Sequence, residues 1–280
     1  MNTPKVSIVV PCYNQAQYLD QALQSVFDQT CTTWECIIVN DGSTDATEVI
    51  ALNWVEKDKR FRYYAKQNEG LGKTRNYGIS KSNGQFILPL DSDNQLMKDF
   101  AQDAIAVFEI NQDIGVVYGD AEYFGEKNGI WKVGQYDLKK MLAGNYIDAC
   151  AIFRKKVWVT AGGFDENMPH QGEEDWMFWI ALGALNVKFH HLNKTTFRYF
   201  VSKNSMIRSF TDAMVISNYD YILKKYSVQY QKHYRDVYFL YEKNATTYKN
   251  NLKSEKFVID LFCSTFFGFS IFGLYRINKK

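Results

Sequence analysis

The sequence predicts an α/β domain with a mainly parallel central sheet flanked by helices, followed by a helical C-terminal extension. Short, continuous apolar segments are typical of strands buried on both faces. Segments with helical spacing separate them, and this alternation favours parallel strands with helices on both sides of the sheet. After about residue 210 the chain becomes rich in Tyr and Lys and keeps a helical period.

The first four strands are predicted from apolar, β-branched and aromatic segments. They are expected at 5–10, 34–41, 61–66 and 85–90, and a later strand at 114–119. Helices are expected at 17–29, 43–57, 73–82 and 99–111. Ser43 or Thr44 is predicted to cap the second helix through its hydroxyl group.

The change in composition divides the chain into two parts. We expect an α/β domain over residues 1–209 and a helical extension over 210–280. No internal repeat and no Pro/Gly-rich linker separates them.

Charge and cysteine content narrow the class of protein. The net charge of +2 gives no electrostatic argument for binding nucleic acid. The chain has five cysteines and no C-x-x-C motif, which argues against disulfides and a zinc site and favours a reducing compartment, the cytoplasm. The N-terminal segment reads as a strand and not as a signal peptide.

Polar segments follow each of the first four predicted strands. They read PCYN, NDGSTD, KQNEG and LDSDN, and parallel strands bring such ends to one edge, where α/β sheets bind ligands. Asp91 and Asp93 could share one hard cation with substrate phosphates, although D-x-D triplets are also common in turns. Asp41 could face the same crevice or belong to a helix cap.

A second acidic group lies at Glu173, Glu174 and Asp175, beside Trp176. Neighbouring acids in a crevice raise one another's pKa, which suits a general base. The alternative is a solvated turn that places acids at the positive end of a helix. Arg75 and Arg198 are candidate partners of an anionic ligand, or ordinary surface charges.

Five segments in order resemble the family 2 glycosyltransferases, over about residues 4 to 206. They are VSIVVPCYNQAQYLDQALQSVFDQT, CIIVNDGSTDAT, NEGLGKTRNYGISKSNGQFILPLDSDN, GGFDE and GEEDWMFWIAL. The resemblance implies a GT-A fold and an inverting, metal-dependent transferase that uses a nucleotide-activated sugar, with UDP as the usual nucleotide. It implies a glycan or lipid-linked acceptor in the synthesis of a bacterial-type surface polysaccharide.

The resemblance also implies roles for individual residues. Asp175 would be the catalytic base, and Asp93 would bind Mn²⁺ or Mg²⁺ at the diphosphate. Possible acceptor or diphosphate contacts are Glu174, Trp176 and Arg198. The nucleotide would be bound by Pro11, Tyr13, Asn14, Asp41, Arg75, Asp91 and Ser92. The segment FRYFVSKNSM departs from the family pattern, because Phe200 and Ser202 stand where Arg and His are common.

Two other functions compete with this one. Gly72, Lys73 and Thr74 match the end of a phosphate-binding P-loop, but Gln67 stands where its first glycine is required. An ATPase or kinase is therefore the weaker alternative. A catalytically silent module that binds a sugar nucleotide is the other.

The apolar segment 257–275 is flanked by cations and interrupted by Asp260. We expect an amphipathic helix in the plane of a membrane surface, which would place the protein peripherally on the inner face of the cell membrane. A helix packed on the protein's own core and a membrane span are the alternatives.

Overall fold

A computed structural model describes residues 3–202, 209–267 and 271–272. The chain forms two compact units, Met1–Tyr226 and Ser227–Lys280. The first unit includes α8 (Asp212–Lys225). The boundary of the functional domain at residue 209 stays a prediction.

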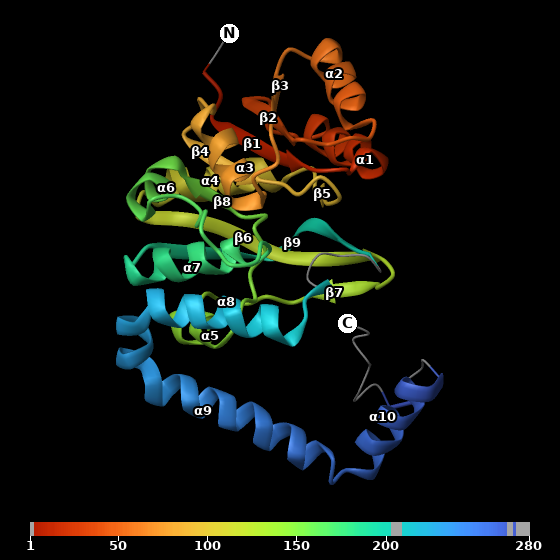
Figure 1. The fold of residues 1–280 in the computed structure, drawn as a ribbon, viewed down its shortest axis with the longest axis vertical. Coiled ribbons are helices and arrows are strands. Elements are labelled where there is room, and N and C mark those ends of the chain that lie inside the picture. The colour runs from red at the N-terminus through yellow and green to blue at the C-terminus, as the bar shows by residue number, and fades with distance from the viewer. Residues whose placement is uncertain (1–2, 203–208, 268–270, 273–280) are drawn as a thin grey trace. The chain divides into compact units, whose positions relative to one another are not determined.

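One nine-stranded sheet organises the first unit, with the order β3-β2-β1-β4-β8-β6-β9-β5 and with β7 paired to β6. Helices cover it, as Figure 1 shows. The strands are β1 (Val6–Cys12), β2 (Trp34–Asp41), β3 (Phe61–Lys66), β4 (Phe86–Pro89), β5 (Gln95–Leu96), β6 (Ile114–Gly125), β7 (Gly129–Trp131), β8 (Ile152–Arg154) and β9 (Lys188–Val201).

The helices of this unit lie between the strands and after them. Besides α8 they are α1 (Ala16–Phe27), α2 (Thr47–Lys57), α3 (Leu71–Ser80), α4 (Phe100–Ile110), α5 (Leu138–Ala143), α6 (Lys155–Ala161) and α7 (Glu174–Ala184). The predicted cap of the second helix is wrong. The helix begins at Thr47, whose N–H donates to Asp45 Oδ1 at 3.0 Å, while Ser43 Oγ accepts from the N–H of Asn14.

The predicted parallel sheet is confirmed for β1 to β4. β1 pairs in parallel with β2 and β4, and β2 pairs in parallel with β3. β1, β2 and β4 are buried along their whole length, which explains their largely apolar sequences, whereas the edge strand β3 is mostly half-buried. Gly78 of α3 allows the helix to approach closely, since a Cβ there would collide with Val9.

The rest of the sheet is mixed. β8 runs antiparallel to both β4 and β6, whereas β6 and β9 are parallel partners over most of their length. The strand predicted at 114–119 extends to Gly125, because its second half pairs with both β7 and β9. Because β8 runs antiparallel to β4, the start of β8 lies at the edge of the sheet where β4 ends.

The second unit contains α9 (Ser227–Asn251) and α10 (Glu255–Phe267), which confirms a helical extension for its described residues. Asp260, which interrupts the apolar segment, does not face the surroundings. Its side chain is fully buried, and Oδ1 accepts from the N–H groups of Ile271 and Phe272 at 2.6 and 2.8 Å. Within the described residues no helix is long and apolar enough to cross a membrane. Parts of the segment 257–275 lie outside the described residues.

Candidate active site

The loops after β1 and β2 are joined through Asn14. Its backbone has a φ of 53°, and its Oδ1 accepts from the N–H of Thr44 at 2.8 Å. Pro11 lies within β1 opposite Val39, and the side chain of Tyr13 is 51% exposed. Of the three residues predicted to line a nucleoside pocket, Pro11 is buried within β1, whereas Tyr13 and Asn14 are both exposed just after it.

Asp41, at the end of β2, organises the segment that leads into α3. Its carboxylate pairs with Lys66 and accepts from the N–H groups of Glu69 and Gly70 at 3.1 and 3.0 Å. Gly70 has a φ of 93°, which favours glycine, and a Cβ there would meet the Gln171 side chain. Asp41 therefore fixes the turn before α3, and only its remaining lone pairs are open to a ligand.

Arg75 of α3 lies at the centre of the site and is 2% exposed. Its Nη1 pairs with Glu174 at the start of α7, and its Nη2 lies 2.6 Å from Oδ1 of Asp91 after β4. Burial by itself lowers the pKa of Arg75, but Asp91 and Glu174 raise it above its usual value. The guanidinium group thus stays charged and joins three segments that are distant in the sequence.

The turn that contains Asp91, Ser92 and Asp93 is anchored by its neighbour. Asn94 Oδ1 accepts from the N–H of Phe200 on β9 at 2.9 Å. Ser92 is buried, whereas Asp91 and Asp93 are partly exposed. Burial, reinforced by the charge of Asp91, raises the pKa of Asp93 to about 7. The carboxyl group of Asp93 therefore binds a proton more tightly than a free aspartate does.

Asp175 lies in the first turn of α7, and its Oδ1 accepts from Asn145 Nδ2 at 3.2 Å. Burial and then the charge of Glu174 raise its pKa well above the usual range. Glu174 itself is buried, pairs with Arg75 and accepts from the N–H of Gly172 at 3.0 Å, so it positions Arg75. The side chain of Trp176 is 1% exposed and its Nε1 donates to the carbonyl of Met141, a placement that favours support over acceptor contact.

Two further residues join this group that the sequence analysis missed. Asp148 precedes β8, and burial together with Asp91 raises its pKa to about 7. Tyr199 of β9 also has a raised pKa, first through burial and then through the charges of Asp148, Asp91, Asp93 and Asp175. In the sequence, Asp148 is an acid just before an apolar segment. This pattern indicates a place at the site only if β8 runs antiparallel to β4, which the sequence does not show.

Arg198 is not brought to the acids by any contact among the described residues. Its Nη1 donates to Gln95 Oε1 at 2.9 Å, its Nε lies 3.3 Å from Glu122 Oε2, and its guanidinium lies over Phe124. Because side chains alternate along a strand, Tyr199 and not Arg198 faces the acids.

The P-loop alternative is not favoured. Gly72, Lys73 and Thr74 lie inside α3, where Thr74 is 1% exposed and its Oγ1 donates to the carbonyl of Gly70 at 2.7 Å. A phosphate-binding loop needs this threonine free to reach a bound magnesium ion.

The donor set fits a hard divalent cation in its chemistry. Carboxylates of Asp91, Asp93, Asp148 and Asp175 influence one another, and the buried Arg75 offsets only part of their charge. Such an excess of negative charge and of oxygen ligands suits Mn²⁺ or Mg²⁺. In the described part of the chain no three His, Cys, Asp or Glu side chains form a metal-binding group by themselves.

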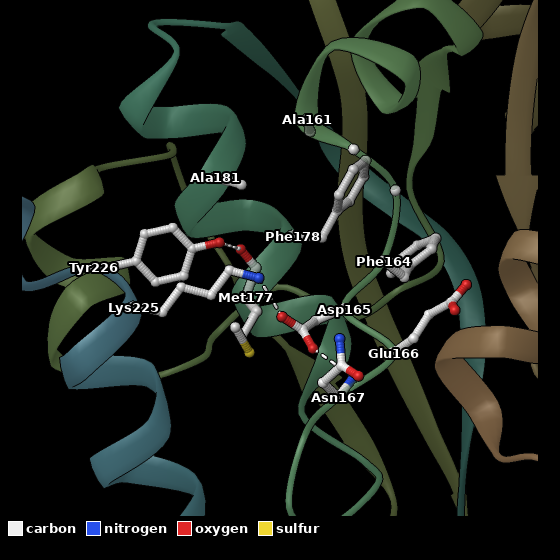
Figure 2. A pocket seen from close by; sticks show the side chains of 12 residues that line it. Ala161, Phe164, Asp165, Glu166, Asn167, Met177, Phe178, Ala181, Lys225 and Tyr226 are labelled. Carbon is white, nitrogen blue, oxygen red and sulfur yellow. Dashed lines mark hydrogen bonds and ion pairs between the residues drawn. The ribbon is translucent and has the colours of Figure 1, made fainter.

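A separate cavity of about 360 Å³ lies beside α7 and contains none of the predicted site residues. Figure 2 shows Asp165 of the GGFDE segment paired there with Lys225 of α8, while Tyr226 donates to the carbonyl of Met177. Asp165 also accepts from the N–H of Asn167 at 2.7 Å. These contacts hold α8 against α7 and the segment that leads to Asp175.

The comparisons with known proteins agree on one family. The profile described as Glycosyl transferase family 2 matches residues 7–164. Glycosyltransferase GlyA of Streptococcus pneumoniae is 28% identical over 81% of this chain and 37% of its own length. Chondroitin synthase of Pasteurella multocida is 27% identical over 74% of this chain and 22% of its own length. This chain thus spans well under half of either relative.

Solved structures share the fold. Staphylococcus aureus TarS 1–349 in complex with UDP-GlcNAc has a TM-score of 0.63 and 23% identity, covering 74% of this chain and 61% of that one. Mannosyltransferase PcManGT from Pyrobaculum calidifontis, in complex with GDP-Man and Mn²⁺, has a TM-score of 0.58 and 14% identity, covering 95% of this chain and 88% of that one.

Replacing Arg75 by Met should destabilise the first unit by about 3 kcal/mol near pH 8, because Glu174 and Asp91 lose the cation that compensates their charge. The deficit should shrink as the pH is lowered toward 5. Arg75 lowers the pKa of Asp148 and Asp175, so without it their carboxyl groups bind protons more tightly in the folded state and the loss of stability decreases at low pH. Urea unfolding followed by tryptophan fluorescence measures this, since all the tryptophans lie in the first unit.

Lys73→Met is the matched control, since Lys73 is a cation of the same helix whose ion pair with Glu69 is exposed. We expect a change within about 0.5 kcal/mol. Equal losses in the two variants, or a loss in Arg75→Met that does not depend on pH, would contradict the central role of Arg75.

Proposed function

This chain belongs to glycosyl transferase family 2, and we propose that it transfers a sugar from a nucleoside diphosphate to a hydroxyl group of a glycan or lipid-linked acceptor. The observation that carries the proposal is the convergence of Asp91, Glu174 and Asp175 around the buried Arg75, with Asp93 two residues after Asp91. In this proposal Asp93 belongs to the diphosphate-binding end of the site and Asp175 to the proton-accepting end.

UDP is the proposed nucleotide and surface polysaccharide the proposed product. The fold shared with TarS, solved in complex with UDP-GlcNAc, supports the first. The relationship to a chondroitin synthase supports the second. In this proposal Pro11, Tyr13 and Asn14 would hold the base and ribose, together with Asp41, Asp91 and Ser92.

Asp93 is the proposed ligand of Mn²⁺ or Mg²⁺, with Asp91 beside it. When bound, the cation supplies positive charge that stabilises the leaving diphosphate. Burial and then the charge of Asp91 raise the pKa of Asp93, and a bound cation would favour its ionised form. The Mn²⁺ complex of PcManGT, which has the same fold, agrees with it.

Asp175 is the proposed general base. The acceptor hydroxyl must lose a proton as its oxygen attacks the anomeric carbon from the face opposite the diphosphate, which inverts the configuration. Its raised pKa increases its affinity for that proton, and Asn145 orients the carboxylate. Glu174 takes no proton in this scheme, since its charge is already paired with Arg75.

Ligand-induced stabilisation tests the donor site. A nucleoside diphosphate at a hundred times its Kd should stabilise the protein by about 2.7 kcal/mol. We expect UDP with Mn²⁺ to raise the Tm most among UDP, GDP, dTDP, ADP and ATP. The gain due to Mn²⁺ should be larger at pH 8 than at pH 6, because Asp93 has a pKa of about 7 and the cation must displace its proton below that pH.

Asp93→Asn is the control and should abolish the dependence on Mn²⁺ while it leaves the fold intact. Stabilisation by ATP alone would contradict the proposed donor site, and an undiminished response to Mn²⁺ in Asp93→Asn would contradict the assigned ligand.

Asp175→Asn tests the catalytic assignment against a silent binding module. We expect sugar transfer to fall by about 10²–10⁴ in kcat while stabilisation by UDP is unchanged. In the wild type kcat should rise with pH, because the raised pKa keeps Asp175 protonated under acidic conditions. If the wild type and Asp175→Asn both bind UDP but neither transfers sugar to any acceptor tested, the result would favour the silent module.

We further propose that α10 places the protein on the inner face of a membrane. Val258, Ile259 and Phe262 are 41%, 42% and 53% exposed, so this helix presents an apolar face to its surroundings. Asp260 is buried and so adds no charge to that face. Such a surface fits the interfacial region of a bilayer and would hold the enzyme near a lipid-linked acceptor.

Removing residues 250–280 should release the protein from vesicles of anionic phospholipid in a sedimentation assay. Phe262→Glu within the full chain should weaken binding in the same direction. Val49→Glu is the matched control, since Val49 is 61% exposed on α2 of the first unit. Undiminished sedimentation of the truncated protein would refute the membrane proposal.

A further inference from the structure

Three aromatic side chains form a continuous cluster beside the acids, which we call the aromatic wall: Tyr123 of β6, Trp131 of β7 and Tyr199 of β9. Tyr123 stacks on Trp131 with ring centroids 5.9 Å apart and an interplanar angle of 5°. Tyr199 meets both rings edge to face, at 6.0 Å from Tyr123 and 5.8 Å from Trp131. Strand pairing explains the cluster, because Tyr123 lies opposite Tyr199 and the β6–β7 hairpin adds Trp131 (Figure 1).

The wall is joined to the turn that carries Asp93. β5 pairs with β9 through Gln95 and Arg198, and Asn94 Oδ1 accepts from the N–H of Phe200 at 2.9 Å. Tyr199 lies between these two anchor points on β9. Its ring also lies within the electrostatic field of Asp91, Asp93, Asp148 and Asp175. One end of the wall therefore borders the carboxylates proposed to carry out the reaction.

Part of the surface of the aromatic wall remains accessible. Trp131 and Tyr199 contact the hydrophobic core, yet all three rings remain partly exposed. Ile130, the neighbour of Trp131, is 49% exposed, and Lys127 covers Tyr123 with its ammonium group 3.7 Å from the ring centroid. The half-buried indole of Trp131 is held parallel to the ring of Tyr123 and therefore forms a rigid surface. Such a surface loses little conformational entropy when a ligand binds to it.

The chemistry of this surface matches a pyranose ring. An aromatic face is electronegative and attracts the weakly positive C–H bonds on the less hydroxylated face of a sugar. The nearby carboxylates accept hydrogen bonds from sugar hydroxyl groups. An alkyl chain or an apolar peptide would use the rings but would leave these acceptors unpaired, which is costly.

We propose that the aromatic wall is the acceptor subsite and that the accepting sugar of the glycan stacks on Trp131. This inference rests on the proposed function, since it assigns the second substrate of the same site. Stacking there would direct an acceptor hydroxyl toward Asp175, because Tyr199 connects the wall to the acids. Trp131 is a binding residue in this assignment and takes no part in proton transfer.

Binding of simple sugars tests the assignment. The probes are methyl β-D-glucopyranoside, methyl β-D-galactopyranoside and methyl α-D-mannopyranoside, with sorbitol as an open-chain polyol control, measured by saturation-transfer NMR titration on the full chain. We expect at least one pyranoside, and not sorbitol, to bind the wild type. Trp131→Ala should weaken its binding about tenfold or more, while Trp131→Phe retains most of it.

The matched control is Tyr234→Ala, since Tyr234 also stacks on a neighbouring ring and is 68% exposed, but belongs to the second unit. It should bind the pyranosides as the wild type does. If Trp131→Ala fails to fold, Trp131→Leu replaces it, because leucine keeps an apolar side chain without a ring.

The outcomes separate this inference from the proposed function. Failure of every pyranoside to bind the wild type, or equal binding by a folded Trp131→Ala or Trp131→Leu, overturns the acceptor subsite even where UDP with Mn²⁺ stabilises the protein. Loss of pyranoside binding in these variants, with the UDP response unchanged, supports the subsite. A wild type that binds pyranosides at Trp131 but gives no response to any nucleotide contradicts the proposed donor chemistry and leaves the sugar site standing.

Discussion

The ion pairs of Arg75 hold the candidate site together. This guanidinium is almost completely buried, and it joins α3, the turn after β4 and the start of α7. Burying a charge is unfavourable unless it is paired, so the position of each partner is strongly constrained by the others. The turn with Asp93 and the helix start with Asp175 thus take their relative positions from one residue, to which Asp41 adds by fixing the turn before α3.

The same arrangement leaves the site with more negative charge than Arg75 can compensate. The pKa values of Asp93 and Asp148 are both raised to about 7, because burial and the charge of Asp91 disfavour the ionised carboxylates. Such crowding of carboxyl groups is unfavourable by itself, and the proposed cation with its diphosphate would relieve it. The site therefore gives up some stability in the absence of ligands, as functional sites often do.

Much of the N-terminal half could be predicted from the sequence. Buried parallel strands require continuous apolar segments, and the polar residues after them converge because parallel strands end at one edge. Asp41, Asp91 and Asp93 became candidates in this way, whereas the role of Asp175 was implied by the family resemblance. The helix cap at Ser43 or Thr44 was wrong, because the hydroxyl of Ser43 is bonded to the backbone of Asn14 and the helix begins later.

The sequence by itself determined the strand–helix alternation, the family resemblance and the acids at the strand ends, since local apolar patterns and short motifs encode these directly. Only the tertiary structure decided that Asp148 joins them, because that depends on β8 running antiparallel to β4. It also decided that Tyr199 and not Arg198 faces the acids, and that Trp131 meets Tyr123 across a hairpin. Strand direction and register are set by contacts between segments distant in the chain, and no local pattern contains them.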